Sequence, residues 1–152
     1  MNLTLELDDT DRQILNRLQD DARRSFKDIA KEVNVSEATV FVRVRKLLKN
    51  DVIKSFKAIV DPKLVGKGTL AFVMLRVNPN VYTKVLPILM KMDDIYEIYD
   101  VTGAYYAILK IRTKSTEELA AIIDKIGMIE GITGTETAVV LRSIKEELSI
   151  KI

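Results

Sequence analysis

Residues 35–49 hold the side chains best suited to bind a charged partner. Apolar residues at Val40, Val44 and Leu47 follow i, i+4, i+7 spacing, which predicts a helix with one narrow apolar stripe. Ser36 precedes that stripe and is a good N-cap, because its hydroxyl can accept from a free backbone donor of the first turn. A helix with cations and small residues opposite its stripe suits the major groove of DNA, which is about 12 Å wide. The alternative is an ordinary surface helix whose late cations merely suit its dipole.

The side chains that would face DNA divide into two predicted sets. Base-edge contacts are predicted for one cation that points away from the stripe and for the small residues beside it: Arg45, with Ala38, Thr39 and Val42 lining the groove. Phosphate contacts are predicted for the remaining polar groups: Ser36, Arg43, Lys46 and Lys49.

Positive charge is concentrated in the part of the chain that holds this helix. The formal net charge of the whole chain is +2, but residues 1–21 carry six acids and two arginines, a net of −4. Residues 22–60 carry ten cations and four acids, a net of +6, and residues 61–152 carry twelve of each. Contacts to DNA phosphates require such a concentration of cations.

Two further helices are predicted before this one. Asp8 can cap a first helix over residues 9–18, and Ser25 with Asp28 resembles a capping box that opens a second helix over residues 26–33. Asn34 follows the second helix and tolerates the left-handed conformation of a tight turn. The three helices in this order predict a helix-turn-helix domain, since the small side chain of Ala30 would let two helices cross closely.

The remainder of the chain predicts one more strand, a hinge and a second domain. Residues 52–60 alternate loosely and are β-branched, which predicts a strand that trails the helix-turn-helix domain over residues 1–60. Asp61-Pro62 and two glycines then predict a hinge over residues 61–68. Residues 69–152 predict the order βαββαβ, a ferredoxin-like α+β domain, from these segments: strands 70–77, 95–101, 105–112 and 135–144, and helices that end near Met92 and begin after Ser115. Pro87 is awkward in the first of those helices, so we expect the helix to begin near Leu86 or to be kinked.

The first strand of the second domain is apolar on both faces. Residues 70–75 supply apolar groups to both sides, as a strand buried on both sides does. Two helices cover only one face of such a sheet, so a second subunit is the simplest partner for the other face. The alternative is a monomer with a few exposed apolar side chains. We therefore expect at least a homodimer.

The composition excludes several kinds of site. The chain has neither cysteine nor histidine, which removes disulfides, thiolate and imidazole chemistry, and metal sites built on those ligands. No Walker loop or GxGxxG is present, so we expect no cofactor, no metal and no enzymatic activity. The longest apolar run is too short to cross a membrane, no signal-peptide pattern opens the chain, and the absence of cysteine fits a cytoplasmic location.

Over essentially its whole length the chain resembles the Lrp/AsnC family, also called feast/famine regulators. The resemblance is carried by the order and spacing of these groups of residues: Leu7-Asp8, Asp11, Ile14-Leu15 and Leu18; Ser36, Val40, Arg43-Val44 and Lys46-Leu47; Val52-Ile53, Phe56 and Ala58-Ile59-Val60-Asp61-Pro62; Tyr99-Asp100-Val101-Thr102-Gly103; and Gly131-Ile132, Thr135, Thr137 and Val140-Leu141. The resemblance implies an N-terminal helix-turn-helix domain of the winged type. It also implies a transcription factor without enzymatic activity, whose C-terminal domain dimerises, senses amino acids and builds tetramers or octamers.

The resemblance also places an amino-acid effector site between dimers, around one turn and the final strand. The residues it implies are Gly103, Ala104, Tyr105, Tyr106, Thr135 and Thr137. Gly103 can bring backbone donors close to a ligand carboxylate. Many members carry acids where this chain has Ala104 and Tyr106, and the loss of those acids weakens the expectation of a site for an ammonium group. The alternative is a structural β-turn, with threonines present for their strand propensity.

Two functions of different kinds follow from these observations. The first is a sequence-specific transcriptional regulator that binds double-stranded DNA and responds to an amino acid or a related small molecule. The second is an architectural DNA-binding protein that has no effector. A carboxylate enzyme on the ferredoxin-like domain is remote, because the chain has no histidine or cysteine.

Overall fold

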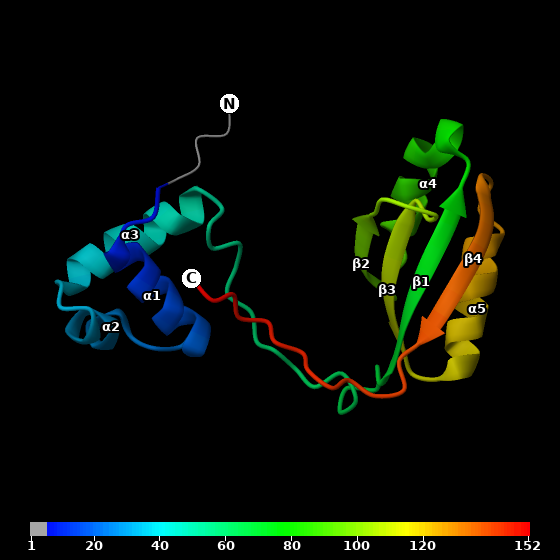
Figure 1. Ribbon diagram of the computed structural model, residues 1–152. Helices are drawn as coiled ribbons and strands as arrows, with labels where there is room; N and C mark the ends of the chain where they lie inside the picture. Colours follow the sequence, from blue (N-terminus) through cyan, green and yellow to red (C-terminus); the bar gives the residue numbers. More distant parts are fainter. Residues whose placement is uncertain (1–5) are drawn as a thin grey trace. The chain divides into compact units, whose positions relative to one another are not determined.

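A computed structural model describes residues 6–152, and the chain divides into two compact units (Figure 1). One unit holds the residues up to Ala58 together with Lys145–Ile152, and the other holds Ile59–Ile144. The division between Ala58 and Ile59 lies just before the hinge that the sequence predicts over residues 61–68.

The N-terminal unit contains three helices, α1 (Asp9–Asp20), α2 (Phe26–Glu32) and α3 (Glu37–Lys49). Their apolar stripes meet in one small core. Its buried members are Ile14, Leu18, Ile29, Ala30, Val40 and Val44, and Phe26, Val33, Val35 and Ile53 pack against them. Ala30, 5% exposed, lies in the core where α2 meets α3, as its small side chain predicted.

Each helix begins at the residue that the sequence indicated. The Asp8 carboxylate accepts from the Asp11 backbone N–H at 2.8 Å, and the hydroxyls of Ser25 and Ser36 cap α2 and α3 in the same way. Ser25 and Asp28 differ from a full capping box, because the Ser25 hydroxyl bonds to the Asp28 carboxylate at 2.6 Å. Asn34 has a φ of 54°, the left-handed conformation expected of the turn between α2 and α3.

The strand predicted over residues 52–60 is absent, which corrects the trailing strand of the winged-type prediction. Residues 54–60 have no regular secondary structure, and Ile59 is 78% exposed. The alternation and β-branching are present in the sequence, but a strand exists only where a neighbour completes its hydrogen bonds. Within this segment, Ile53 packs against the helical core.

The last eight residues belong to the N-terminal unit, although the sequence placed them in the second domain. The side-chain amide of Gln19 in α1 donates to the Ile150 carbonyl at 2.9 Å and accepts from the Ile150 N–H at 2.7 Å. Asn16, one turn earlier, donates to the Ile152 carbonyl at 3.1 Å. Two amide side chains on one face of α1 thus hold the C-terminal segment through hydrogen bonds to its backbone.

The C-terminal unit has the predicted βαββαβ order, with one 3₁₀ turn added. Its elements are β1 (Thr69–Val77), η1 (Pro79–Val81), α4 (Tyr82–Leu89), β2 (Ile95–Asp100), β3 (Ala107–Thr113), α5 (Thr116–Gly127) and β4 (Ile132–Val139). The strands form one antiparallel sheet in the order β2-β3-β1-β4 (Figure 1). The fold class, an α+β chain with a helix-turn-helix domain and a ferredoxin-like domain, is confirmed.

Helices cover one face of the sheet and leave the other face open. Ala71, Val73 and Leu75 are fully buried on the face that α4 and α5 cover. Phe72 and Met74 alternate with them and lie half-buried on the other face, which we call the open face. Strand β1 therefore carries apolar groups on both sides, as its sequence predicted.

Pro87 lies inside α4, and the helix neither begins near Leu86 nor ends at Met92. It starts at Tyr82 and ends at Leu89, two residues after the proline. Thr83 and Pro87 are both exposed, so water can bond to the carbonyl that the missing N–H leaves free. The final strand ends at Val139 rather than at residue 144, and residues 140–152 have no regular structure.

Candidate nucleic-acid interface

Helix α3 buries one stripe and exposes the opposite face. Val40 and Leu47 are fully buried and Val44 is 2% exposed, while Val42 on the opposite face is 63% exposed. The side chains beside Val42 are also exposed, namely Ala38, Arg45, Lys46 and Lys49. Among the residues that the structure describes, these three cations form no ion pair, so their charges are available to a partner.

An aromatic pair supports the arginine at the centre of this face. The guanidinium of Arg45 lies 5.5 Å from the centroid of the Phe41 ring, within the range of a cation–π contact. Phe41 in turn meets Phe26 edge to face, with ring centroids 6.3 Å apart and an interplanar angle of 61°. Phe26 begins α2, so the helix before the turn helps to hold the arginine of the helix after it.

Arg43, for which the sequence predicts a phosphate contact, forms two ion pairs within the chain. Its guanidinium lies 2.6 Å from the Asp8 carboxylate and 2.9 Å from the carboxylate of Asp11, whose side chain is only 3% exposed. This charge-assisted bond lowers the pKa of the Asp8 carboxyl and raises the pKa of Arg43. Arg43 therefore links α3 to the N-terminal end of α1.

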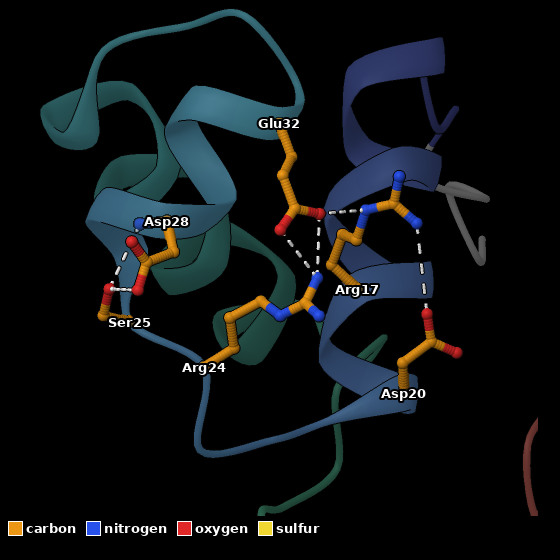
Figure 2. A network of polar contacts seen from close by, with 6 residues as sticks. All are labelled: Arg17, Asp20, Arg24, Ser25, Asp28 and Glu32. Carbon is orange, nitrogen blue, oxygen red and sulfur yellow. Dashed lines mark hydrogen bonds and ion pairs between the residues drawn. The ribbon is translucent and has the colours of Figure 1, made fainter.

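A second set of ion pairs joins α2 to α1 (Figure 2). The Glu32 carboxylate lies 2.6 Å from Arg17 Nε and 2.8 Å from a terminal nitrogen of Arg24. Arg17 and Arg24 come from α1 and from the connection to α2, so one carboxylate of α2 holds both segments. These contacts hold α1 and α2 together, and they neutralise one more cation of residues 22–60, Arg24.

Ser36 and Thr39 also direct their polar groups to each other. Their hydroxyl oxygens are 2.7 Å apart, and the Ser36 hydroxyl accepts from the Thr39 backbone N–H at 3.0 Å. The cap of α3 thus engages both hydroxyls of its first turn.

The turn implied as part of an effector site has its expected backbone. Gly103 has a φ of 108°, a conformation that residues with a Cβ rarely adopt, and no atom lies close to where a Cβ would stand. Thr102, Gly103 and Ala104 are exposed. The chain then returns to the sheet, where the Tyr106 N–H donates to the Leu75 carbonyl at 2.8 Å.

The two tyrosines after the turn have separate partners. Tyr105 donates to Glu136, and the guanidinium of Arg76 lies 5.0 Å from the Tyr105 ring. Tyr106 packs against Tyr82 of α4 with ring centroids 5.1 Å apart. Burial and a hydrogen bond to Asp100 raise the pKa of Tyr82 to about 12, so this phenol stays neutral near pH 7.

Thr135 and Thr137 share one face of β4, but it is not the face of Tyr105. They pair with Leu75 and Val73, so their side chains point to the side covered by the helices. Glu136, which bonds to Tyr105, pairs with Met74 and points to the open face. Within one chain the six implied effector residues therefore do not converge on one hollow.

Sequence reasoning missed several residues with a clear place in these two regions. Phe26, Phe41 and Asp8 act through contacts with Arg45 and Arg43, and only the i, i+4 spacing of Phe41 and Arg45 was visible in the sequence. Arg76 and Asp100, which lie at strand ends near the turn, carried no local signal for their partners. In the described part of the chain, acidic side chains form no group that could hold a metal ion, and no helix could span a membrane.

Comparison with known proteins agrees with both units. Residues 7–48 match the model of the AsnC-type helix-turn-helix domain, and residues 70–150 match the model of the Lrp/AsnC ligand binding domain. The HTH-type transcriptional regulator FL11 of Pyrococcus horikoshii is 41% identical over 151 residues, which cover 98% of this chain and 100% of that protein.

Solved structures show the same fold. The structure of E. coli AsnC is similar with a TM-score of 0.91 and 32% identity, covering 97% of this chain and 99% of that one. The regulator NMB0573 of Neisseria meningitidis, solved as a complex with L-Met, has a TM-score of 0.89 at 20% identity and covers 95% of this chain and 96% of that one, a likeness of fold alone. From the two domain matches and the FL11 relative, this chain belongs to the Lrp/AsnC family of helix-turn-helix transcriptional regulators.

Proposed function

We propose that this regulator binds specific sites on double-stranded DNA through the outward face of α3. The observation that carries the proposal is the exposed Arg45, which forms no ion pair with any described residue, opposite a buried stripe and with Lys46 and Lys49 beside it. Arginine can donate two hydrogen bonds to guanine in the major groove, and the lysines can neutralise phosphates. A DNA-binding regulator acts where the chromosome lies, which in cells without a nucleus is the cytoplasm.

Arg45→Ala and Lys49→Ala should weaken DNA binding in different ways. Loss of Arg45 should cost roughly 1–3 kcal/mol at one base pair of a selected site and relax the preference there. Loss of Lys49 should weaken all sequences alike and reduce the salt dependence by about one charge. Fluorescence anisotropy on a selected site and on random DNA, at several salt concentrations, measures both effects. An equal loss on both DNAs for Arg45→Ala would remove Arg45 from base recognition.

We further propose that the working unit is at least a dimer, with the open face of the sheet as its contact. One recognition helix makes few contacts, and paired helices about 34 Å apart meet successive major grooves on one face of the DNA. Half-buried Phe72 and Met74 supply apolar surface on the open face. Footprinting of a selected site should then show two protected stretches about one helical turn apart, whereas broad coverage would favour an architectural protein.

The C-terminal unit is proposed to bind an amino acid or a related small molecule. The match to a ligand binding domain supports this, and the L-Met complex of the Neisseria meningitidis regulator makes methionine a first compound to test. The candidate groups are the backbone of Gly103, the phenol of Tyr105 and, on the other side of β4, Thr137. Arg76 and Glu136 beside Tyr105 could pair with the carboxylate and the ammonium of such a ligand.

Isothermal titration of the common amino acids should give saturable heat with at least one of them. The side of the sheet that binds is then decided by two variants, Tyr105→Ala on the open face and Thr137→Ala on the helix side. We expect Tyr105→Ala to weaken binding more, because Tyr105 lies beside both charged groups. Heat from none of the amino acids would contradict the amino-acid proposal.

A further inference from the structure

The middle of the outward face of α3 is apolar, although it lies among cations. Val42 is 63% exposed, and Ala38 stands one turn before it on the same side. A shallow open hollow of about 320 Å³ lies beside them, and its lining residues are Ala38, Thr39, Val42 and Arg43.

The polar groups around this hollow already have partners within the chain. The Thr39 hydroxyl is bonded to the Ser36 hydroxyl at 2.7 Å, and the Arg43 guanidinium is bonded to Asp8 and Asp11. The centre of the hollow therefore offers a partner aliphatic groups, while these contacts direct polar atoms at its edge toward the chain.

Only one base presents an apolar group in the major groove. Thymine carries a C5-methyl group there, while the other groups on the base edges are hydrogen-bond donors and acceptors. We infer that Ala38 and Val42 contact thymine methyl groups, so that α3 selects sites by thymine as well as by the guanine proposed for Arg45. This inference rests on the proposed function, because it assumes that this face of α3 enters the groove.

Helix geometry limits where these thymines lie. With a rise of about 1.5 Å per residue, Val42 lies about 6 Å from Ala38 and about 4.5 Å from Arg45 along the axis. Base pairs are about 3.4 Å apart, so a thymine at Val42 lies one or two steps from the guanine at Arg45. A second thymine, at Ala38, lies about two steps further on. The contact with the Phe41 ring restricts the positions that the Arg45 guanidinium can take, and so restricts the distance between the guanine and the thymines.

Uracil scanning tests the inference, since deoxyuridine pairs like thymidine and lacks only the methyl group. A site is first selected from random duplexes with the full-length protein, and each thymine in it is then replaced singly by deoxyuridine. We expect affinity to fall about fourfold at one or two thymines of each half-site, the effect of leaving about one methyl group unburied. The other thymines should tolerate the change.

Two variants assign the effect to its side chain. In Val42→Ala the deoxyuridine effect should disappear at the sensitive thymine, since the methyl group has lost its contact, while Arg45 still selects its guanine. Leu48→Ala, which trims an exposed apolar residue near the end of the same helix, should leave the ratio of thymine to uracil affinity unchanged. Val42→Ala also controls for a change in DNA stiffness on removal of the methyl group, because such an effect would persist in this variant.

The outcomes separate this inference from the function on which it rests. If a site is selected and no deoxyuridine substitution weakens binding, the methyl contact is wrong and sequence-specific binding stands. A uracil effect that is undiminished in Val42→Ala also overturns the assignment. If the protein selects no sequence from random DNA, the proposed function fails, and the inference fails with it.

Discussion

Replacing Arg43 with methionine should lower the free energy of unfolding of the N-terminal unit by about 3 kcal/mol, although Arg43 lies on the helix proposed to bind DNA. The substitution keeps an unbranched, largely apolar side chain and removes the guanidinium with its charge. It leaves the Asp11 carboxylate, 3% exposed, without the cation that lies 2.9 Å away. Removing one partner of a buried ion pair is costly, because the other charge stays buried and unpaired.

The two units can be followed separately in this experiment. All five tyrosines follow residue 81 and the chain has no tryptophan, so tyrosine fluorescence reports only on the C-terminal unit. Urea unfolding by circular dichroism should shift in Arg43→Met, while the transition by tyrosine fluorescence should not. Lys46→Met, the same change at an exposed position of α3, should stay within about 0.5 kcal/mol of wild type. Equal stability of the two variants would show that the Asp11 pair contributes little.

The loss of stability in Arg43→Met should also depend on pH, and it should become smaller in acid. The hydrogen bond from Arg43 lowers the pKa of Asp8 below its ordinary value of 3.8. A carboxylate with a lowered pKa in the folded state stabilises the fold above its ordinary pKa, and this stabilisation is lost as the pH falls through the lowered value. The gap between wild type and Arg43→Met should thus hold near neutral pH and narrow below pH 3.8.

Gly131→Ala should destabilise the C-terminal unit by about 3 kcal/mol. Gly131 precedes β4 with a φ of 99°, and a Cβ there would stand 2.2 Å from Val81 Cγ2. The backbone cannot easily move away, because the Gly131 carbonyl accepts from the Asn78 N–H at 2.8 Å. Strain at a positive φ and the steric overlap each cost about 1–3 kcal/mol, so their sum is large for a single methyl group.

Gly127→Ala is the matched control for this substitution. Gly127 ends α5, has no positive φ and would place its Cβ in open space. The alanine there should stabilise the unit by about 0.4–1 kcal/mol, since it restricts the unfolded chain. Tyrosine fluorescence in urea measures both variants. If Gly131→Ala lowers the free energy of unfolding by no more than about 1 kcal/mol, then η1 and Val81 move aside for the new methyl group at little cost.

The sequence by itself determined the kinds of element and the faces that they bury. Helix periodicity at Val40, Val44 and Leu47 marked the stripe that the structure buries, and the serine caps marked where α2 and α3 begin. The two-sided apolar pattern of residues 70–75 marked the central strand of the sheet. These features are local, because a residue's neighbours three, four or two positions away set the face it occupies.

The tertiary structure alone decided which polar groups meet and which segments find a neighbour. The ion pairs of Arg43 could not be predicted, because its partners lie 35 and 32 residues away, at the start of a helix whose position no local pattern reveals. The C-terminal segment bonds to Gln19, which lies 131 residues earlier in the chain. Residues 52–60 have strand propensity, but they do not pair with another strand. Tyr105 joined Glu136 rather than Thr137, because the pairing of β4 with β1 set the direction of each side chain. An ion pair or a strand needs two segments at once, and periodicity along one segment says nothing about the position of the other.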